Sequence, residues 1–327
     1  MRRLTGLDAA FLAIETPTSH MHVLGVAVVD PLTAPGGFSF GTVRALIEER
    51  LPLLTPFRRR AVEVPLGLQN PLWIDDPDFD LDDHLRLSRL PPPGGPAQLA
   101  EAVAGIAAEQ LDRSKPLWEL TLIEGLEYGH QAIVVKVHHS AIDGLSGVEL
   151  MSVLFDLEAE PATIERDSDE WVPDRVPTVQ ELVGHAVVSW ARQPLLVARA
   201  VRNLGRSMVR LAKRVGDDAV EMTAPLNAPR LAMNAAISAR RKIAFASMPL
   251  DDVKRVKNAF GVKVNDVVLA VVAGALRSYL EQRGELPDRP LTVTVPTSVR
   301  ADDQRGSMGN RVSALFTALP RRDDRPG

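Results

Sequence analysis

The spacing of hydrophobic and polar positions in the first half of the chain predicts alternating strands and helices. An apolar run at 23–29 predicts a buried strand, and amphipathic spacing predicts helices over 42–51 and 99–111. Two further apolar runs, at 118–123 and 131–137, predict strands that are joined by a glycine-containing turn. Strands interleaved with helices in this way indicate an α/β domain.

The second half of the chain changes character after residue 158. Residues 158–178 combine Glu, Asp, Pro and Thr in quick succession, a composition typical of an exposed linker. Farther on, the pattern predicts two helices and two strands, at 250–260, 267–282, 291–295 and 313–319. We therefore expect an N-terminal subdomain, a linker that contains a helix, and a partial C-terminal subdomain, at 1–158, 159–239 and 240–327.

The helix predicted inside the linker, at 194–215, carries a basic stripe and an apolar stripe. The cations recur at three- and four-residue spacing, at Arg199, Arg202, Arg206, Arg210 and Lys213. Such a helix can lie on an anionic membrane surface. It can equally be a connector that packs its apolar stripe on a domain and leaves its arginines in water, and both alternatives stay open.

Composition narrows the classes of function. A chain of 327 residues has room for roughly two domains. The net charge of −4 and the 5% share of aromatic residues argue against nucleic-acid binding. The lack of cysteine excludes disulfides, thiolate metal sites and a cysteine nucleophile. No apolar run reaches the roughly 18 residues of a membrane span and the N-terminus lacks signal-peptide features, so we expect a cytoplasmic protein.

The sharpest candidate site is the sequence His-His-Ser-Ala-Ile-Asp-Gly at 138–144, which lies between a predicted strand and a predicted helix. Successive strand side chains point to opposite faces, which argues against one metal ion bound by both His138 and His139. The arrangement suits one imidazole that faces a site and one that supports it. A neutral imidazole can accept a proton from a hydroxyl group. Asp143 could orient a ring or form an ion pair, and Gly144 permits a tight turn.

The histidine sequence and the other candidate sites also have purely structural interpretations. The two histidines could be satisfied side chains at a strand end. Asn265 and Asp266 stand where a helix begins and are good N-caps, or Asn265 could bind a carbonyl oxygen or developing oxyanion. The sequence Pro116-Leu117-Trp118 could be strand entry and core packing, or it could be the wall of a substrate channel.

The histidine sequence resembles the HHxxxDG motif of the CoA-dependent acyltransferase superfamily, which includes chloramphenicol acetyltransferase and peptide-synthetase condensation domains. More closely, the whole chain resembles the bacterial wax ester synthase/acyl-CoA:diacylglycerol acyltransferases. Ordered motifs along the chain carry this resemblance, at 7–12, 21–23, 116–120, 225–227, 264–270, 296–300 and 309–311. Several motifs in the same order are more specific than the histidine sequence alone.

The resemblance implies a fold and a mechanism. The fold is a chloramphenicol acetyltransferase-like α/β architecture of two mixed-sheet subdomains with a channel between them, the second incomplete here. His139 would be the general base on the acceptor hydroxyl, which then attacks the acyl-CoA thioester without an acyl-enzyme. His138 would support the turn, and Asp143 would brace the loop through an ion pair for which Arg300 is a candidate. Gly144 would keep the loop close to the site.

The resemblance also implies the substrates. We expect transfer of a long-chain acyl group from acyl-CoA, as co-substrate and with no cofactor or metal, to diacylglycerol or a fatty alcohol. A peripheral location at the inner face of the cell membrane or on lipid droplets would fit lipid substrates. Two alternatives stay open: a truncated, catalytically impaired lipid-binding homologue, and an acyltransferase with another hydroxyl acceptor.

Overall fold

The computed structural model describes residues 2–34, 37–142, 153–155, 171–184, 186–187, 228–298 and 312–319. The chain forms two compact units. The first comprises Met1–Leu196, Ile237–Phe245 and Gly306–Asn310, and the second comprises Val197–Ala236, Ala246–Arg305 and Arg311–Gly327. The candidate histidines belong to the first unit.

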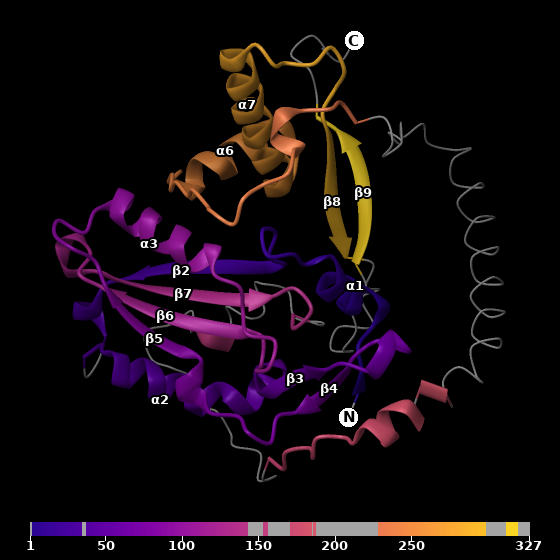
Figure 1. Ribbon diagram of the computed structural model, residues 1–327. Coiled ribbons are helices and arrows are strands. Elements are labelled where there is room, and N and C mark those ends of the chain that lie inside the picture. Colours follow the sequence, from indigo (N-terminus) through magenta and orange to yellow (C-terminus); the bar gives the residue numbers. More distant parts are fainter. Residues whose placement is uncertain are drawn as a thin grey trace. The chain divides into compact units, whose positions relative to one another are not determined.

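The main sheet of the first unit has four strands in the order β2-β7-β6-β5 (Figure 1). Their bounds are His22–Val29, Gln131–His138, Trp118–Glu124 and Leu85–Arg89, respectively. The pairs β2–β7 and β7–β6 are antiparallel, whereas β5 runs parallel to β6. The three predicted strands of the first half are therefore confirmed, but β2, which was expected to be buried, lies at the edge of the sheet and has no fully buried residue. The structure adds β5, which has only one buried residue.

Helices α2 (Phe40–Arg50) and α3 (Pro96–Ala108) cover opposite faces of this sheet (Figure 1). Along β7, Ala132 and Val134 pack in the cluster that contains α3, whereas the intervening Ile133 and Val135 pack in the cluster that contains α2. Both faces are covered, so seven of the eight residues of β7 are buried. Helix α3 begins three residues before its predicted start, because proline is tolerated in the first turn of a helix.

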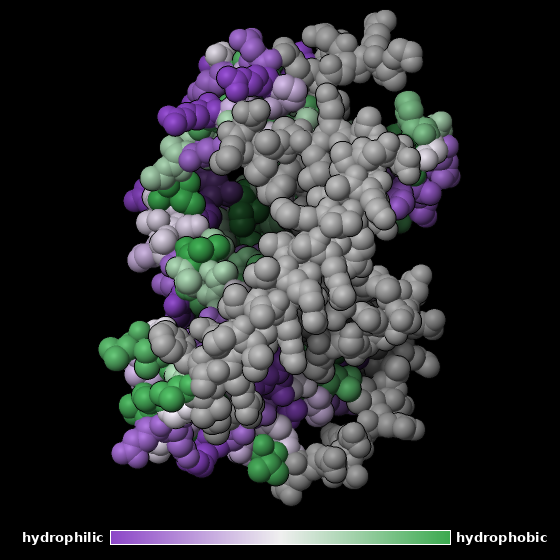
Figure 2. Space-filling view, turned by 90° about the vertical axis from the view of Figure 1, so that its right-hand side faces the viewer, coloured by the Kyte–Doolittle hydropathy of each residue, from purple (hydrophilic) through white to green (hydrophobic). Residues whose placement is uncertain are grey.

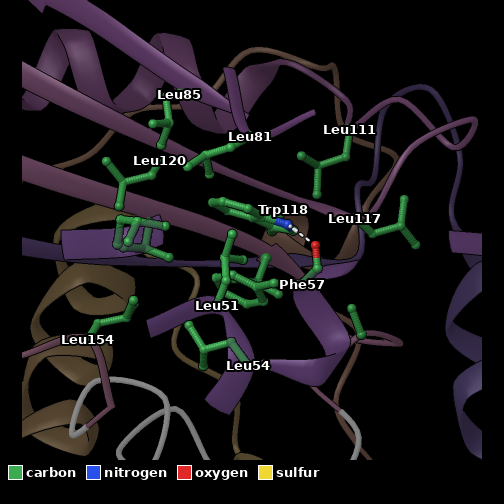
Figure 3. Close-up of a cluster of buried hydrophobic side chains, with 14 of the residues drawn as sticks. Leu51, Leu54, Phe57, Leu81, Leu85, Leu111, Leu117, Trp118, Leu120 and Leu154 are labelled. Carbon is green, nitrogen blue, oxygen red and sulfur yellow. Dashed lines mark hydrogen bonds between the residues drawn. The ribbon is translucent and has the colours of Figure 1, made fainter. Parts of the chain in front are cut away.

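Trp118 lies at the centre of the larger cluster (Figure 3). Its indole Nε1–H donates a hydrogen bond to the carbonyl oxygen of Phe57 at 2.8 Å. Its ring stacks on Phe57 on one side and on His84 on the other, with centroid distances of 4.3 and 4.6 Å. The imidazole of His84 in turn lies 2.8 Å from the carbonyl oxygen of Trp118. These contacts fix the entry of β6, the neighbour of the strand that carries the histidines.

A smaller antiparallel sheet has the order β1-β4-β3, and helix α1 (Gly6–Ile14) follows its first strand. The strand bounds are Arg2–Arg3, Leu72–Asp75 and Arg59–Val62. Residues 171–184 and 186–187 pack against this sheet, with the N–H of Asp174 donating to the carbonyl oxygen of Asp75 and Leu182 buried beside Leu72. The ring of Trp171 lies under the guanidinium of Arg58 at 5.0 Å. Residues 171–184 and 186–187 of the predicted linker therefore contact the first unit, although most of the residues at 171–178 are exposed.

The second unit contains α6 (Leu250–Phe260), α7 (Val264–Arg283), β8 (Thr292–Ser298) and β9 (Val312–Ala318). These are the four elements predicted beyond residue 240, and β8 pairs with β9 in antiparallel register. Both helices end at a glycine with positive φ, +65° at Gly261 and +66° at Gly284. The predicted ends of these two helices are therefore confirmed.

No single helix of the described residues is long and apolar enough to cross a membrane. Helices α6 and α7 together have the length and composition of a membrane span, but the pair is bent by 103°. On the face shown in Figure 2, hydrophobic side chains form separate patches among hydrophilic ones. The predicted helix at 194–215 lies outside the described residues.

Candidate active site

The candidate histidines lie where β7 ends beside the start of β2. His138 is the last residue of β7 and pairs with His22 across the sheet. The next residue, His139, continues the ladder by donating its backbone N–H to the carbonyl oxygen of Met21 at 2.8 Å. The chain then turns, and the N–H of Ala141 donates to the carbonyl oxygen of His138 at 2.9 Å. The first residues of the motif are thus anchored to the sheet by backbone hydrogen bonds.

His138 is a buried, supporting side chain with 1% exposure. Its Nδ1 accepts the backbone N–H of Ser140 at 3.1 Å and lies 2.6 Å from the Ser140 hydroxyl. Because Nδ1 accepts, the proton of the neutral ring is on Nε2. Burial lowers the pKa of His138 to about 4, so the ring is neutral at neutral pH.

An ion pair between a buried carboxylate and a partly exposed arginine lies beside this ring. Glu15 is the first residue after α1, and its side chain is 1% exposed. Arg113 donates to Glu15 Oε2 from Nε at 3.0 Å and from Nη2 at 2.5 Å, and Nη2 also donates to the carbonyl oxygen of Leu12 at 2.6 Å. Burial by itself would raise the pKa of Glu15, but the hydrogen bond from Arg113 and the neighbouring positive charge hold it below its usual value. The carboxylate oxygen Oε2 lies 3.6 Å from Nε2 of His138.

His139 has a different environment, as the alternation of strand side chains predicts. Its ring is half-buried and stacks on Phe11 of α1 with a centroid distance of 4.9 Å and an interplanar angle of 18°. Burial lowers its pKa below the ordinary imidazole value. Among the described residues, neither ring nitrogen has a hydrogen-bond partner. A neutral imidazole held by stacking and with free nitrogens can accept a proton from a hydroxyl group.

The end of α3 is held to the same part of the sheet by two polar side chains. His22 Nε2 lies 3.1 Å from the carbonyl oxygen of Ala107, and Nζ of the buried Lys136 donates to the carbonyl oxygens of Ile106 and Glu109. The ammonium of Lys136 also forms a 2.8 Å ion pair with Glu119. Cations near the last turn of a helix stabilise it. His22, like His84, thus has structural contacts.

The backbone of the sequence Pro116-Leu117-Trp118 lies next to the histidines. All three residues are buried, Leu117 and Trp118 with 1% exposure, and the carbonyl oxygen of Leu117 accepts the N–H of His138 at 3.0 Å. The position of these side chains fits the core-packing interpretation.

The remaining candidate residues belong to the second unit or lie outside the described residues. Asp143, Gly144 and Arg300 lie outside the described residues. Asn265 and Asp266 are exposed residues of α7 in the second unit. Neither is the N-cap, which is Lys263; Asp266 instead accepts the N–H of Lys263 at 2.8 Å from the third helical position. This corrects the capping prediction, because the helix begins earlier than the apolar pattern indicates.

The sequence interpretation missed Phe11, Glu15 and Arg113. Phe11 lies in one of the motifs that carry the family resemblance, but nothing in the motif showed that its ring meets His139. Glu15 and Arg113 are 98 residues apart and belong to no local pattern. No group of three or more His, Asp or Glu side chains in the described part of the chain has the arrangement of a metal site.

Comparison with known proteins gives concordant results. The sequence model of the wax ester synthase/diacylglycerol acyltransferase catalytic domain matches residues 4–268. A Mycobacterium tuberculosis protein that carries the name diacylglycerol O-acyltransferase is 36% identical over 324 residues, which cover 98% of this chain and 63% of the relative. The chain therefore spans less than two thirds of the length of that relative.

The chain is similar to several solved structures, among them an acyltransferase and a condensation domain. The wax ester synthase/diacylglycerol acyltransferase of Marinobacter aquaeolei VT8 is 26% identical with a TM-score of 0.60, covering 90% of this chain and 65% of that protein. The first condensation domain of the calcium-dependent antibiotic synthetase, 18% identical with a TM-score of 0.53, covers 98% of this chain and 70% of its own length. The second likeness shows the fold alone, and it is the fold class that the sequence predicted.

Proposed function

The chain belongs to the wax ester synthase/diacylglycerol acyltransferase family, and we propose that it transfers a long-chain acyl group from acyl-CoA to the hydroxyl of diacylglycerol or a long-chain alcohol. The observation that carries the proposal is the environment of His139. This ring is half-buried, stacked on Phe11, and has a lowered pKa, so a neutral base is available at the end of β7. The two adjacent histidines therefore have different proposed roles: His139 reacts, and the buried His138 supports the turn.

In the proposed reaction, His139 accepts the proton of the acceptor hydroxyl as the oxygen attacks the thioester carbonyl carbon. The new C–O bond forms, the tetrahedral intermediate collapses, and the C–S bond breaks. The imidazolium of His139 then returns its proton to the departing CoA thiolate, so no charge remains on the protein. The products are an ester, which is triacylglycerol or a wax ester, and free CoA.

Other residues have roles that extend the proposal. The amide of Asn265 is our candidate for stabilising the oxyanion of the tetrahedral intermediate. Asp143 and Gly144 would maintain the turn that follows His139. The donor is acyl-CoA, and the proposal requires no metal or resident cofactor.

Product analysis tests this function. The purified chain is incubated with a long-chain acyl-CoA together with diacylglycerol and a fatty alcohol, and lipids are separated by thin-layer chromatography while free CoA is measured. We expect ester and CoA in equal amounts, and a loss of about 10²–10⁴-fold in rate for His139→Ala. Ester formation that is unchanged in a folded His139→Ala variant would exclude the general-base role. Acyl-CoA or lipid binding without any product would favour a lipid-binding homologue.

A location on a membrane or lipid-droplet surface is a separate part of the proposal. Its support is the lipid nature of the proposed substrates and the basic stripe predicted at 194–215. Flotation with anionic liposomes tests it, with charge reversal of Arg202, Arg206 and Arg210. We expect reduced binding for this variant, whereas reversal of the exposed Lys254 and Arg255 serves as the control. Equal binding by both variants contradicts the surface role of the helix.

A further inference from the structure

The ion pair between Glu15 and Arg113 ties three distant parts of the first unit to one another. Glu15 ends α1, Arg113 follows α3, and the shared carboxylate faces His138 at the end of β7. The carboxylate is completely buried, and both Nε and Nη2 of Arg113 donate to its Oε2. Moving a charge out of water costs free energy, so a buried carboxylate is stable only where its ion pair and hydrogen bonds offset that cost.

The carboxylate lies on the protonated side of the His138 ring. Ser140 donates its N–H to Nδ1, so Nε2 carries the proton, and Nε2 lies 3.6 Å from Oε2 of Glu15. This Nε2 is buried and has no hydrogen-bond partner within the described part of the chain. A buried polar atom without a partner is rare in native structures and often accompanies a functional role. A negative charge at this position favours the tautomer that has its proton on Nε2.

The tautomer of His138 determines how the backbone turns around His139. Only an unprotonated Nδ1 can accept the N–H of Ser140, which follows His139. The preceding side is fixed because the N–H of His138 donates to the carbonyl oxygen of Leu117. The backbone is therefore held on both sides of His139, and the direction of its side chain depends on the ring that precedes it.

We propose that Glu15 and Arg113 are positioning residues: the carboxylate of Glu15, oriented by Arg113, holds His138 in the Nε2–H tautomer and thereby orients the ring of His139 toward the acceptor hydroxyl. The catalytic part of this inference rests on the proposed acyltransferase function. The structural part, which couples Glu15 to the tautomer of His138, does not depend on any substrate.

An NMR measurement tests the structural part on the full chain. Selective ¹⁵N labelling of histidine rings and two-bond ¹H–¹⁵N correlation distinguish the two neutral tautomers, and the His138→Asn variant assigns the signals. We expect a single Nε2–H tautomer in the unchanged protein and a mixture of tautomers in Glu15→Gln. The matched control is Glu124→Gln, which removes the ion pair of Glu124 with Arg89 elsewhere in the same unit and should leave the tautomer unchanged.

Kinetics test the catalytic part. For Glu15→Gln we expect kcat to fall about 10–100-fold with KM within about twofold, because misplacement of a catalytic group by about 1 Å can cost 10²-fold. Arg113→Lys keeps a cation and should restore most of the rate that Arg113→Met loses. The loss from Glu15→Gln should be small in a His138→Asn background, since residues that act through one another are not additive.

The outcomes separate the inference from the function on which it rests. A folded Glu15→Gln variant with the tautomer of the unchanged protein overturns the inference, whether or not the protein has acyltransferase activity. Losses that add fully in the double variant also overturn it, since they would show that Glu15 does not act through His138. If Glu15→Gln fails to fold, as judged by circular dichroism, the same measurements on Arg113→Lys and Arg113→Met decide. A shift of tautomer in an inactive protein supports the coupling and counts against the acyltransferase function alone.

Discussion

The backbone N–H of His138 donates to the carbonyl oxygen of Leu117 at 3.0 Å. This bond joins the Pro116-Leu117-Trp118 sequence to the histidine sequence, which lies about 20 residues farther along the chain. Leu117 precedes β6, His138 ends β7, and Trp118 pairs with Val137 between them. The buried Pro116-Leu117-Trp118 sequence therefore supports the histidines through the main chain, while its side chains fill the core.

The core role of Trp118 makes a prediction about stability. Trp118→Ala removes a fully buried indole and should lower the free energy of unfolding by about 3–5 kcal/mol. Trp118→Phe keeps a ring but leaves the carbonyl oxygen of Phe57 without its donor, which should cost about 1–3 kcal/mol. Urea unfolding measures both. If Trp118→Phe instead keeps full stability and alters the acyl-chain length preference, Trp118 lines the substrate channel.

The pH dependence of the reaction should report on His139. A general base works only when it is unprotonated, so the rate falls as pH decreases through its pKa. Because burial holds this pKa below the ordinary imidazole value of about 6.5, the midpoint of the decline in kcat/KM should lie below pH 6.5. The measurement is a profile of kcat/KM against pH from 5 to 8 on the protein shown to remain folded. A midpoint at or above pH 7 would contradict the assignment of His139 as a general base whose pKa is lowered by burial.

Local patterns predicted most of the secondary structure. The apolar runs of β6 and β7 are covered on both faces, and that of β2 is half-buried at the edge of the sheet. The glycines after α6 and α7 adopt the left-handed conformation that ends a helix. Propensity acts over a few residues, so these elements can be inferred without knowledge of the fold. Strand β5 has only one buried residue, and therefore it lacks the apolar pattern of the others.

The candidate site was only partly predictable, for the same physical reason. The histidine sequence is contiguous, so its place at the end of a strand follows from the pattern around it. The ion pair of the buried Glu15 carboxylate with Arg113 depends on the packing of α1 against the segment after α3, which no local spacing encodes. The stacking of Phe11 on His139 likewise arises from tertiary structure. The supporting residues of a site can thus be distant in sequence even when its reacting residue belongs to a motif.

Buried neutral histidines should make the protein less stable in mild acid. Burial lowers the pKa of both His22 and His138 to about 4, whereas each would titrate near 6.5 in the unfolded chain. Between these values the unfolded chain binds more protons, so stability falls as pH decreases from 6.5 toward 4. The slope for one such histidine approaches about 1.4 kcal/mol per pH unit. Urea unfolding at pH 5, 6 and 7 measures it.

His22→Gln offers the matched variant for this pH effect. An amide can still donate to the carbonyl oxygen of Ala107 but does not titrate, so the dependence on pH should become shallower. The same slope in this variant and in the unchanged protein would show that His22 is not responsible.

Two glycines near and within α3 should respond oppositely to alanine. Gly94 has φ +73°, and a Cβ there would lie 1.9 Å from the carbonyl oxygen of Gly125, so the loop before α3 and the turn after β6 can approach only with glycine. Gly94→Ala should therefore destabilise the first unit by more than about 1 kcal/mol. Gly105 lies in the exposed middle of α3 with no atom near its Cβ position, and Gly105→Ala should stabilise by about 0.5–1 kcal/mol. Thermal unfolding of the two variants checks both signs, and a neutral Gly94→Ala would show that the two loops are not in this close contact.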